Sequence, residues 1–487
     1  MRQAVVIIHG IGEQRPMETV RAFVAGALGV EKEALSKFVF SKPDQIDDTL
    51  ELRRLSASTK DVEGSVLEKN CETDFYELYW QHLMPDGSWS SVLAWVFDLT
   101  RRKLPLRLRL VRIWLFGLLA AAIAGIALLG MGLYLYLDGS PLWQWAAKPV
   151  ILSVSVVGVL GWLARRPLKW FLLGRAERFF LGYVGDAARY LTPDPPNIKG
   201  RRDIRTAGLT LLRRLHEDEL RRYERIILVG HSLGSVIAYD LITWFWQERH
   251  HRRDLGHCTG KRGTAVMDHA DPLDNNDRSP LKELADPSSP SPKAPDEFPN
   301  SQRSLWQKFR KDHFLPWLIT DLVTLGSPLA YADVLLTGSK EAFQEGKRQR
   351  EFPVCPPEGE DKRDYGLLGR TYKDKKGAHY VRILHHGAPF AVTRWTNLYF
   401  QGDIIGGPVA CLFGNGIRDV ELCAACRGLL DHLLPARSHT RYWDYPSEKN
   451  ASKELVKALQ LNDPELINWT ALAGGCHDSA QVAGDRG

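Results

Sequence analysis

The sequence predicts an α/β fold, in which a mostly parallel β-sheet is flanked by helices and interrupted by an inserted two-helix transmembrane hairpin. Two β-favouring apolar runs, residues 4–8 and 226–229, each stop at a glycine-containing turn, and the second leads directly into a helix-like segment. Strands that lead into helices are typical of parallel sheets. Two long uncharged stretches, which are typical of membrane spans, lie between these strands in the chain.

The first predicted strand lies at the start of the chain. Its sequence over residues 4–8, AVVII, is uniformly apolar, as expected for a strand that is buried on both faces. The sequence HGIG follows at residues 9–12, and its glycines allow the backbone to approach a neighbouring segment closely. The alternation over residues 75–80 predicts another strand, in which Glu77 lies either at the edge of the core or in a pocket.

Residues 113–164 are expected to cross a membrane twice. The first stretch, 113–137, has 25 residues without a charge, and the second, 142–164, contains only Lys148. A bilayer crossing needs about 20 apolar residues, so both stretches are long enough. Aromatic residues gather around the connecting turn, as they do at membrane interfaces. They are Tyr134, Tyr136, Trp143 and Trp145.

The charge distribution also favours a membrane. The chain carries 64 Lys and Arg against 58 Asp and Glu, a net charge of +6. Ten cations flank the hairpin in two segments, 101–112 and 165–175, that contain no acidic residue, and these ten exceed the whole positive excess. The basic character therefore indicates a membrane and not nucleic acid. Because cations concentrate on the cytoplasmic side of membrane spans, we expect an integral protein of the inner or plasma membrane, with its catalytic domain in the cytoplasm.

The cysteines and the N-terminus agree with a cytoplasmic domain. The seven cysteines form no dense disulfide framework, and the N-terminal segment reads as a strand and not as a signal peptide. Cys423 and Cys426 have no second pair at zinc-binding spacing, so they are interpreted as packing residues. No metal and no cofactor are expected.

Residues 230–234, Gly-His-Ser-Leu-Gly, form a G-x-S-x-G motif between the strand at 226–229 and the helix-like segment. Gly230 and Gly234 allow a turn that is too tight for side chains, and this turn places Ser232 at its apex. There the hydroxyl lies at the N-terminus of the following helix, where a developing negative charge is stabilised. The motif predicts Ser232 as a nucleophile for acyl transfer.

Acyl transfer also needs two backbone N–H groups that bind the developing oxyanion. The residue after the nucleophile, Leu233, is expected to supply one of them, and Ile11 in the loop after the first strand is expected to supply the other. Several neighbouring residues are expected to support this arrangement. They are His9, Gly10, Gly12, Gly230 and Gly234.

The pairing of VVIIHGIG near the N-terminus with ILVGHSLGS around Ser232, together with LVTLGSP over residues 322–328, resembles the α/β-hydrolase superfamily. Within this superfamily the chain is most similar to lipase-like serine esterases and to membrane-linked hydrolases of the GPI inositol-deacylase type. The resemblance covers about half of the chain and excludes the hairpin, residues 249–305 and the C-terminal end. It implies a Ser-Asp-His triad, in which the acid and then the histidine follow the serine along the chain.

The family order leads to Asp403 as the acid. It follows a predicted strand over residues 395–400 almost directly, and the acid of this family lies at the end of a strand. A simple turn aspartate remains the alternative reading, because the surrounding loop is rich in glycine. Asp321 and Asp333 flank the preceding strand and are weaker candidates, and Asp240 is expected to face away from the site.

The same order leads to His439 as the base, because it lies in a loop-like stretch where the family places its histidine. His432 is expected on the surface of a helix. His385 and His386 precede Asp403, so they break the family order, and they would line the pocket or end a strand.

The chain divides into six predicted segments. They are a first part of the catalytic domain (1–100), the basic-flanked hairpin (101–175), a second part with the nucleophile (176–248), an insertion (249–305), a third part with the acid and the histidine (306–449) and a C-terminal tail (450–487). The insertion is rich in Pro, Ser, Asp, His and Lys and is expected to be disordered or to form a lid. The tail is expected to be frayed.

Together these features predict a membrane-anchored serine hydrolase that cleaves carboxylic esters with a lipid or another apolar acyl group. Two alternatives remain open. A catalytically silent protein of this fold could serve as a membrane scaffold, and an acyltransferase or a peptidase could use the same triad, because all of these enzymes share the acyl-enzyme step.

Overall fold

The structure is a computed structural model of the 487-residue chain. It describes residues 2–11, 16–44, 53–58, 72–84, 102, 185–192, 194–217, 223–258, 298–299, 302–303, 306–307, 317–357, 367–374, 377–423 and 435–461. The chain forms two compact units, one of Met1–Pro85 and Pro193–Gly487 and one of Asp86–Thr192. The first unit contains the sheet and the candidate site.

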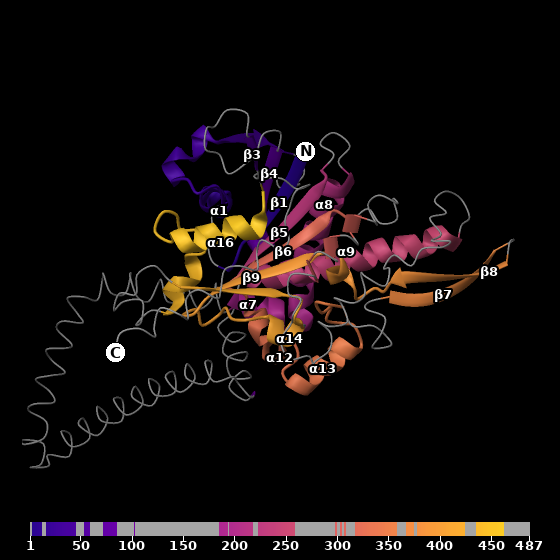
Figure 1. The fold of residues 1–487 in the computed structure, drawn as a ribbon. Coiled ribbons are helices and arrows are strands. Elements are labelled where there is room, and N and C mark those ends of the chain that lie inside the picture. Colours follow the sequence, from indigo (N-terminus) through magenta and orange to yellow (C-terminus); the bar gives the residue numbers. More distant parts are fainter. Residues whose placement is uncertain are drawn as a thin grey trace, which may run out of the picture. The chain divides into compact units, whose positions relative to one another are not determined.

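The first unit is built on a mostly parallel sheet of eight strands in the order β10-β9-β6-β5-β1-β4-β3-β2 (Figure 1). The strands are β1 (Arg2–Ile8), β2 (Val39–Pro43), β3 (Arg53–Ser58), β4 (Glu72–Leu78), β5 (Arg225–His231), β6 (Ile319–Leu325), β9 (Arg394–Phe400) and β10 (Arg418–Leu422). The six strands from β10 to β4 are parallel, whereas β3 and β2 continue the sheet in the antiparallel direction. The predicted α/β class and the mostly parallel sheet are therefore confirmed.

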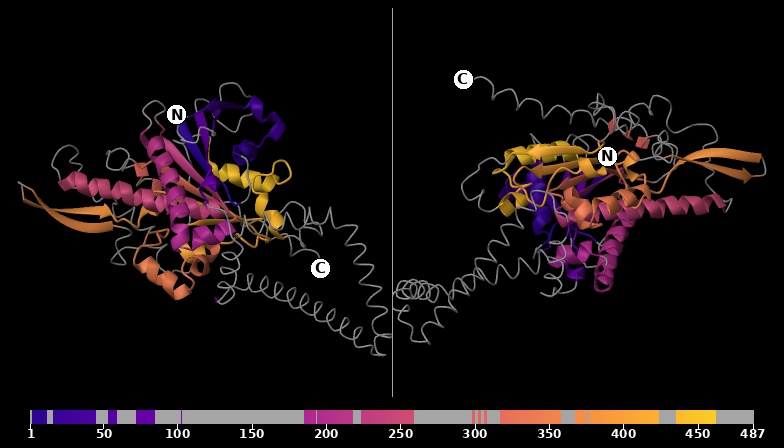
Figure 2. Two further views of the ribbon diagram at one scale, coloured as in Figure 1. Left: turned by 180° about the vertical axis from the view of Figure 1, so that it is seen from behind. Right: turned by 90° about the horizontal axis from the view of Figure 1, so that it is seen from below.

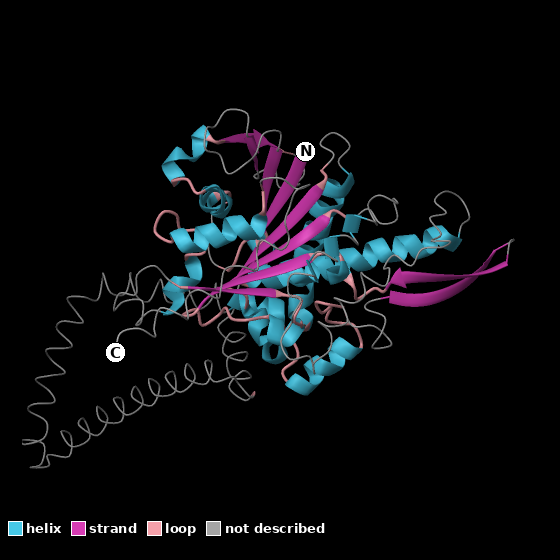
Figure 3. Cartoon of the chain, viewed as in Figure 1, coloured by secondary structure: helices cyan, strands magenta, loops and turns pink. Residues whose placement is uncertain are grey.

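Helices cover both faces of this sheet (Figures 2 and 3). The helices of the first unit are α1 (Glu18–Leu28), α8 (Ile198–Glu217), α9 (Leu233–Cys258), α12 (Ala332–Leu335), α13 (Lys340–Arg348), α14 (Ala410–Phe413) and α16 (Lys449–Leu459), of which α1, α8, α9 and α16 lie on the faces. On one face, α1 and α16 pack together in a core that includes Val5, Phe75 and Val229. Helices α8 and α9 lie on the other face, and α9 leaves the sheet directly from the end of β5.

A separate hairpin projects from the first unit. Strands β7 (Leu367–Asp374) and β8 (Gly377–Leu384) pair antiparallel with each other and extend outward beside the end of α9 (Figure 1). Because β8 precedes β9 in the chain, this hairpin is an excursion between β6 and β9 of the main sheet.

In the second unit, the structure describes Arg102 and residues 185–192, which include α7 (Gly185–Leu191). Within α7, Arg189 pairs with Asp186 at 2.5 Å. The predicted transmembrane hairpin, 113–164, lies outside the described residues. In the part of the chain that is described, no helix combines the length and the apolar character that a bilayer crossing requires.

Two predicted boundaries need correction. Helix α9 continues to Cys258, well beyond the expected start of the insertion at residue 249, and Phe298 and Gln302 near its expected end are both 1 % exposed. Gln302 Nε2 donates to the carbonyl oxygens of Phe390 and Thr393, which explains its burial. Both ends of the predicted insertion therefore belong to the folded domain.

The tail was expected to begin at residue 450, but α16 occupies this region. Its residues Ala451, Leu455, Ala458 and Leu459 are buried against the sheet and α1. Their spacing places them on one face of a helix, which is why the segment folds. The residues after Leu461 lie outside the described part.

Candidate active site

Ser232 occupies the turn between β5 and α9 in a strained backbone conformation. Its φ is +53°, in the left-handed region that residues with a side chain rarely adopt. The Ser232 amide donates to the carbonyl oxygen of Leu325 at 2.9 Å, which ties the turn to the end of β6. The hydroxyl of Ser235, one turn further along α9, donates to the Ser232 carbonyl oxygen at 2.6 Å. The predicted strand–turn–helix setting of Ser232 is therefore present.

The two glycines of the motif are required by close backbone contacts. A Cβ on Gly230 would lie 2.4 Å from the Cα of Ser235, and a Cβ on Gly234 would lie 2.1 Å from the carbonyl oxygen of Ile8. Both distances are far shorter than any real Cβ contact, and the obstructing atoms are backbone atoms that cannot move away independently. The contact at Gly234 also shows that β1 lies directly against the start of α9.

The loop after β1 lies against the same turn. A Cβ on Gly10 would come within 2.9 Å of the Ser232 Cβ and 3.0 Å of the His231 Nδ1. Ile11 follows directly and is half-buried, whereas Gly12 lies outside the described residues. Leu233 is the first residue of α9. The structure thus places the loop with Gly10 and Ile11 beside the turn that contains Ser232 and Leu233.

Asp403 and His439 are directly bonded to each other. Asp403 lies in the turn after β9, and its Oδ2 accepts a hydrogen bond from Nδ1 of His439 at 2.8 Å. The same oxygen accepts from the Tyr442 hydroxyl at 2.7 Å, and Oδ1 accepts from the Ile405 amide at 2.9 Å. Burial alone would raise the pKa of Asp403, but the hydrogen bonds and charge of His439, with help from Tyr442, lower it to about 2. Asp403 is therefore ionised at neutral pH.

The hydrogen bond to Asp403 sets the orientation of the His439 ring. An ionised carboxylate only accepts, so Nδ1 carries the proton and Nε2 is left as a free acceptor in the neutral ring. His439 is 4 % exposed, and its Nε2 is buried and has no hydrogen-bond partner among the described residues. A nitrogen in this state is suited to take a proton.

The Asp403–His439 pair lies beside the turn that holds Ser232. A Cβ on Gly326 would be 2.8 Å from Oδ2 of Asp403 and 2.9 Å from Nδ1 of His439. Gly326 directly follows Leu325, whose carbonyl oxygen accepts the Ser232 amide. The end of β6 thus touches the nucleophile turn on one side and the acid–histidine pair on the other.

His231 links the two parts of the site. Its Nε2 donates to the carbonyl oxygen of His439 at 2.8 Å, and the two imidazole rings lie 4.9 Å apart. Burial, followed by the charge of His439, lowers the pKa of His231 to about 3, so this ring stays neutral. The residue next to the nucleophile therefore holds the backbone of the candidate base.

The other acid candidates have different positions. Asp321 lies near the start of β6, at the opposite end of the strand from Gly326, and pairs with Arg225 and Arg394 at 2.5 Å each. Asp240 pairs with Arg205 of α8 at 2.6 Å, as expected for a side chain that faces away from the site. Asp333 accepts from the amide of Val334, the next residue in α12, at 3.0 Å.

The other histidines are also placed. Nδ1 of His385 accepts from the Gly387 amide at 3.0 Å, in the turn that follows β8, and His386 lies in the same turn. His432 lies outside the described residues.

The packing interpretation is wrong for Cys423, which is exposed, and Cys426 lies outside the described part. No cluster of His, Cys, Asp or Glu that could hold a metal ion occurs among the residues described.

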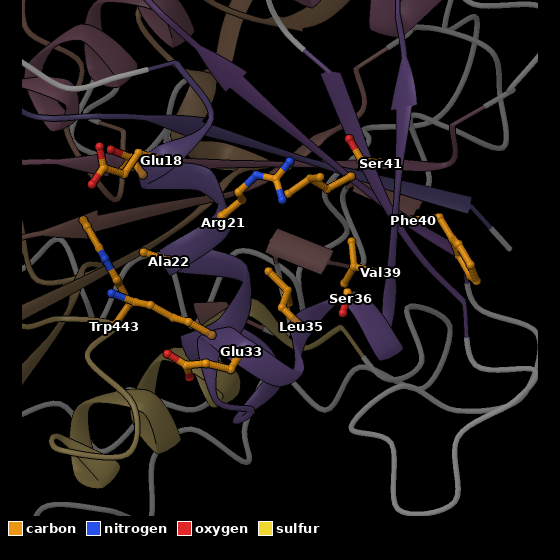
Figure 4. A pocket seen from close by; sticks show the side chains of 13 residues that line it. Glu18, Arg21, Ala22, Glu33, Leu35, Ser36, Val39, Phe40, Ser41 and Trp443 are labelled. Atoms are coloured by element: carbon orange, nitrogen blue, oxygen red, sulfur yellow. The ribbon is translucent and has the colours of Figure 1, made fainter.

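A cavity of about 780 Å³ lies next to this site (Figure 4). It runs along α1 between the 3₁₀ helix η1 (Lys32–Lys37) and the edge strands β2 and β3, and Trp443 forms one end. Leu35, Val39 and Leu55 supply apolar walls. The Trp443 ring also packs at a steep angle against that of His231, with centroids 4.8 Å apart, whereas Ser232, Asp403 and His439 do not line the cavity.

Two further residues bond to the site or to the loop beside it. Tyr442, which no sequence motif indicates, donates to Asp403. Glu77, whose sequence leaves its place at the core edge or in a pocket open, accepts from the Met17 amide at the start of α1. Tyr442 follows His439 by three residues, but no local pattern indicates that its hydroxyl reaches the acid.

Comparison of the chain with family models, with curated proteins and with solved structures gave no match. The evidence for function is therefore the geometry of the site and the residues that form it.

Proposed function

We propose that this chain is a membrane-linked serine hydrolase of the α/β-hydrolase type, which cleaves carboxylic esters with a lipid or another apolar acyl group. One observation carries the proposal. Ser232 lies in a left-handed turn between a strand and a helix, and a buried Asp403–His439 pair lies beside that turn, with an Nε2 that has no hydrogen-bond partner within the described part of the chain. A strained serine and a histidine oriented by a carboxylate are two of the features that acyl transfer by a serine nucleophile uses.

In this proposal, the Ser232 hydroxyl attacks the ester carbonyl carbon while Nε2 of His439 takes its proton. The negative charge on the carbonyl oxygen is stabilised by the backbone N–H groups of Leu233 and Ile11. Asp403 stabilises the imidazolium form of His439, which then gives the proton to the departing alcohol. Water enters, loses a proton to His439 and attacks the acyl carbon, and His439 then returns a proton to the Ser232 oxygen as the acid is released.

The membrane part of the proposal depends on the sequence and on the topology of the sheet. Strands β1–β4 precede the segment with the predicted spans 113–137 and 142–164, and β5, β6, β9 and β10 follow it, yet all belong to one sheet. Both ends of the inserted segment must therefore lie on the same side of a membrane, which an even number of spans allows. An enzyme held at the bilayer would meet substrates that partition there.

Hydrolysis of a short p-nitrophenyl ester by the full chain in detergent tests the proposal. Ser232→Ala should lower kcat to the level of the uncatalysed background, because no other group replaces the nucleophile. Ser339→Ala is a matched control, since Ser339 only caps α13 by accepting from the Ala342 amide. It should retain the activity of the wild-type protein.

The outcomes decide between the candidate activities. Absence of activity from the wild-type protein would contradict the proposal and favour the silent scaffold, whereas activity that is unchanged in Ser232→Ala would contradict it by showing that another group is the nucleophile. Faster release of p-nitrophenol with an added alcohol acceptor, together with formation of a new ester, would favour an acyltransferase. Preferential cleavage of the matching p-nitroanilide would favour a peptidase.

A further inference from the structure

The end of β4 contacts both described ends of the loop that connects β1 to α1. At the start of this loop, the Trp80 indole N–H donates to the carbonyl oxygen of His9 at 3.0 Å, and the two rings stack with centroids 5.2 Å apart. At its end, Oε2 of Glu77 accepts from the Met17 amide at 2.7 Å. The loop that carries Gly10 and Ile11 is therefore anchored to the neighbouring strand at both ends.

Met17 needs this anchor because its own conformation is unfavourable. It precedes the first residue of α1 with φ of +69°, and no side chain of its own caps the helix. A residue with a side chain adopts this region only when its surroundings hold it there. The Glu77 carboxylate supplies that contact, and its negative charge is favourable at the N-terminus of a helix.

Glu77 has no evident role in packing. It is 3 % exposed and lies on the same face of the sheet as Phe75 of the apolar core. Its second oxygen, Oε1, is buried and has no hydrogen-bond partner among the described residues. A buried carboxylate with one partner destabilises a fold relative to an apolar side chain of similar size. The residue is therefore better explained by what it holds than by what it packs against.

The titratable groups near Glu77 do not compensate its charge. Burial raises the pKa of Glu77 to about 7, although the Met17 amide acts in the opposite direction. Burial, and then the charge of Glu77, raises the pKa of Tyr79, which is therefore neutral near pH 7. Burial lowers the pKa of His9 to about 4, so this ring is neutral as well. Ionisation of Glu77 thus changes the local charge without a counter-ion among these groups.

We propose that Glu77 is a positioning residue for the loop that connects β1 to α1 and carries Ile11, the proposed oxyanion donor. Its carboxylate fixes Met17 and so keeps the part of the loop with Ile11 against Ser232. This inference depends on the proposed hydrolase function. Its physical basis is that Gly10 contacts the Ser232 turn while Met17 defines where the same loop must end. A loop with one free end would present its N–H group to the oxyanion in a smaller fraction of molecules.

The test is the rate constant for reaction of the full chain in detergent with a fluorophosphonate, together with kcat and KM for a short p-nitrophenyl ester. At about pH 8, Glu77→Leu should lower the labelling rate and kcat by about 10-fold or more, because complete loss of one oxyanion donor costs about 100- to 1000-fold. KM should change by less than about twofold, since loop position matters most in the transition state. Asp74→Asn is the matched control, because Asp74 is a buried carboxylate at the opposite end of β4.

Glu77→Gln adds a pH-dependent rate comparison, which would not vary with pH if Glu77 only stabilised the fold. The amide keeps an acceptor for Met17 but cannot ionise, so it resembles the protonated carboxyl. The ratio of the wild-type to the Glu77→Gln rate should therefore be greatest above about pH 8 and approach one below about pH 6. This comparison also holds if Glu77→Leu fails to fold.

The outcomes separate this inference from the proposed function. If the wild-type protein does not label at Ser232, the hydrolase proposal fails and the inference fails with it. If the wild-type protein labels but Glu77→Leu labels within about twofold of it, only the inference is overturned. A ratio of wild-type to Glu77→Gln that is constant with pH, or an equal loss in Asp74→Asn, would also overturn it.

Discussion

At the scale of single residues, the acid of the candidate site depends on a tyrosine as well as on the histidine. The Tyr442 hydroxyl donates to Oδ2 of Asp403 and accepts from the Phe400 amide at 3.2 Å. Both groups are buried, so removal of this hydroxyl would leave a carboxylate with one donor fewer and an amide without this acceptor. Tyr442 therefore belongs to the site although it performs no step of the reaction.

We expect Tyr442→Phe to lower the free energy of unfolding by about 1–3 kcal/mol, because it leaves a buried amide unsatisfied. The pKa of Asp403 should rise toward its ordinary value, since one of the donors that lower it is lost. Urea unfolding at neutral pH measures the first effect. Stability unchanged from that of the wild-type protein would show that water or another group replaces the hydroxyl.

The raised pKa of Glu77 predicts a stability that depends on pH. The folded-state pKa is about 7, against 4.5 for an ordinary glutamate, so the folded protein favours the protonated form. The contribution of this group to stability is complete below about pH 4.5 and is lost as the pH rises through about 7. Relative to the wild-type protein, Glu77→Gln should gain roughly 2–3 kcal/mol between about pH 5 and pH 8. Unfolding curves for both proteins at these two pH values measure the gain, and a difference independent of pH would contradict the pKa argument.

At the scale of elements, a buried ion pair network holds α16 on the sheet. Arg225 donates to the carbonyl oxygens of Leu459 and Gln460, and Arg394 donates to that of Ala458. These carbonyls lie at the C-terminus of α16, where cations are favourable. Asp321 compensates both arginines, and they keep its pKa below the ordinary value despite its burial.

Asp321→Asn should therefore lower the free energy of unfolding by about 3–5 kcal/mol, because it leaves two buried cations without their shared anion. Activity per folded molecule should not change, since Asp321 lies at the opposite end of the sheet from Ser232. Chemical unfolding and active-site titration of the folded fraction measure these two effects. A proportionate loss of activity in the folded fraction would show that Asp321 acts on the site.

The elements that the sequence predicted correctly are those with a local pattern. Strands β1 and β5 contain continuous apolar runs, β6 and β9 are rich in β-branched and aromatic residues, and the turn at Ser232 has a motif that its backbone conformation explains. Strands β2 and β3 were missed because they are short and polar at the edge of the sheet, with β2 mostly exposed. Helix α16 was missed because the composition of the tail concealed its apolar face.

The residues of the candidate site were likewise predictable only where a motif or the order along the chain indicates them. Asp403 and His439 were found from chain order and strand ends, and they are bonded in the structure. Glu77 was left undecided, because its contact with Met17 depends on the packing of α1 over the sheet. Tyr442 was missed for a similar reason, since its bond to Asp403 joins two loops that are 39 residues apart. Contacts of this kind depend on tertiary structure and leave no periodic signal.

At the scale of the whole molecule, the order of the strands constrains the membrane topology. In the proposed membrane protein both attachments lie on one side of the bilayer, because β4 precedes the inserted segment and β5 follows it in the same sheet. The basic segments that flank the predicted spans favour the cytoplasmic side. The strand order and the flanking charges thus agree with a hairpin whose two ends lie on the cytoplasmic side.

A cysteine introduced at Ser140, in the turn between the predicted spans, should react with an impermeant maleimide from outside intact cells. A cysteine at Ser438, beside the candidate base, should react only after the membrane is opened. A variant in which all seven native cysteines are replaced provides the background. Labelling of both introduced cysteines from outside, or of neither, would contradict the proposed topology.

In the proposed reaction, Ser232 is a nucleophile that His439 and Asp403 activate. The most direct measurement is reaction of the full chain with a fluorophosphonate, followed by peptide mapping of the adduct by mass spectrometry. We predict one phosphonate per chain, attached to Ser232, and a labelling rate that falls by about 1000-fold or more in His439→Ala. An adduct on a different residue, or labelling of Ser232 at the same rate in His439→Ala, would contradict the account.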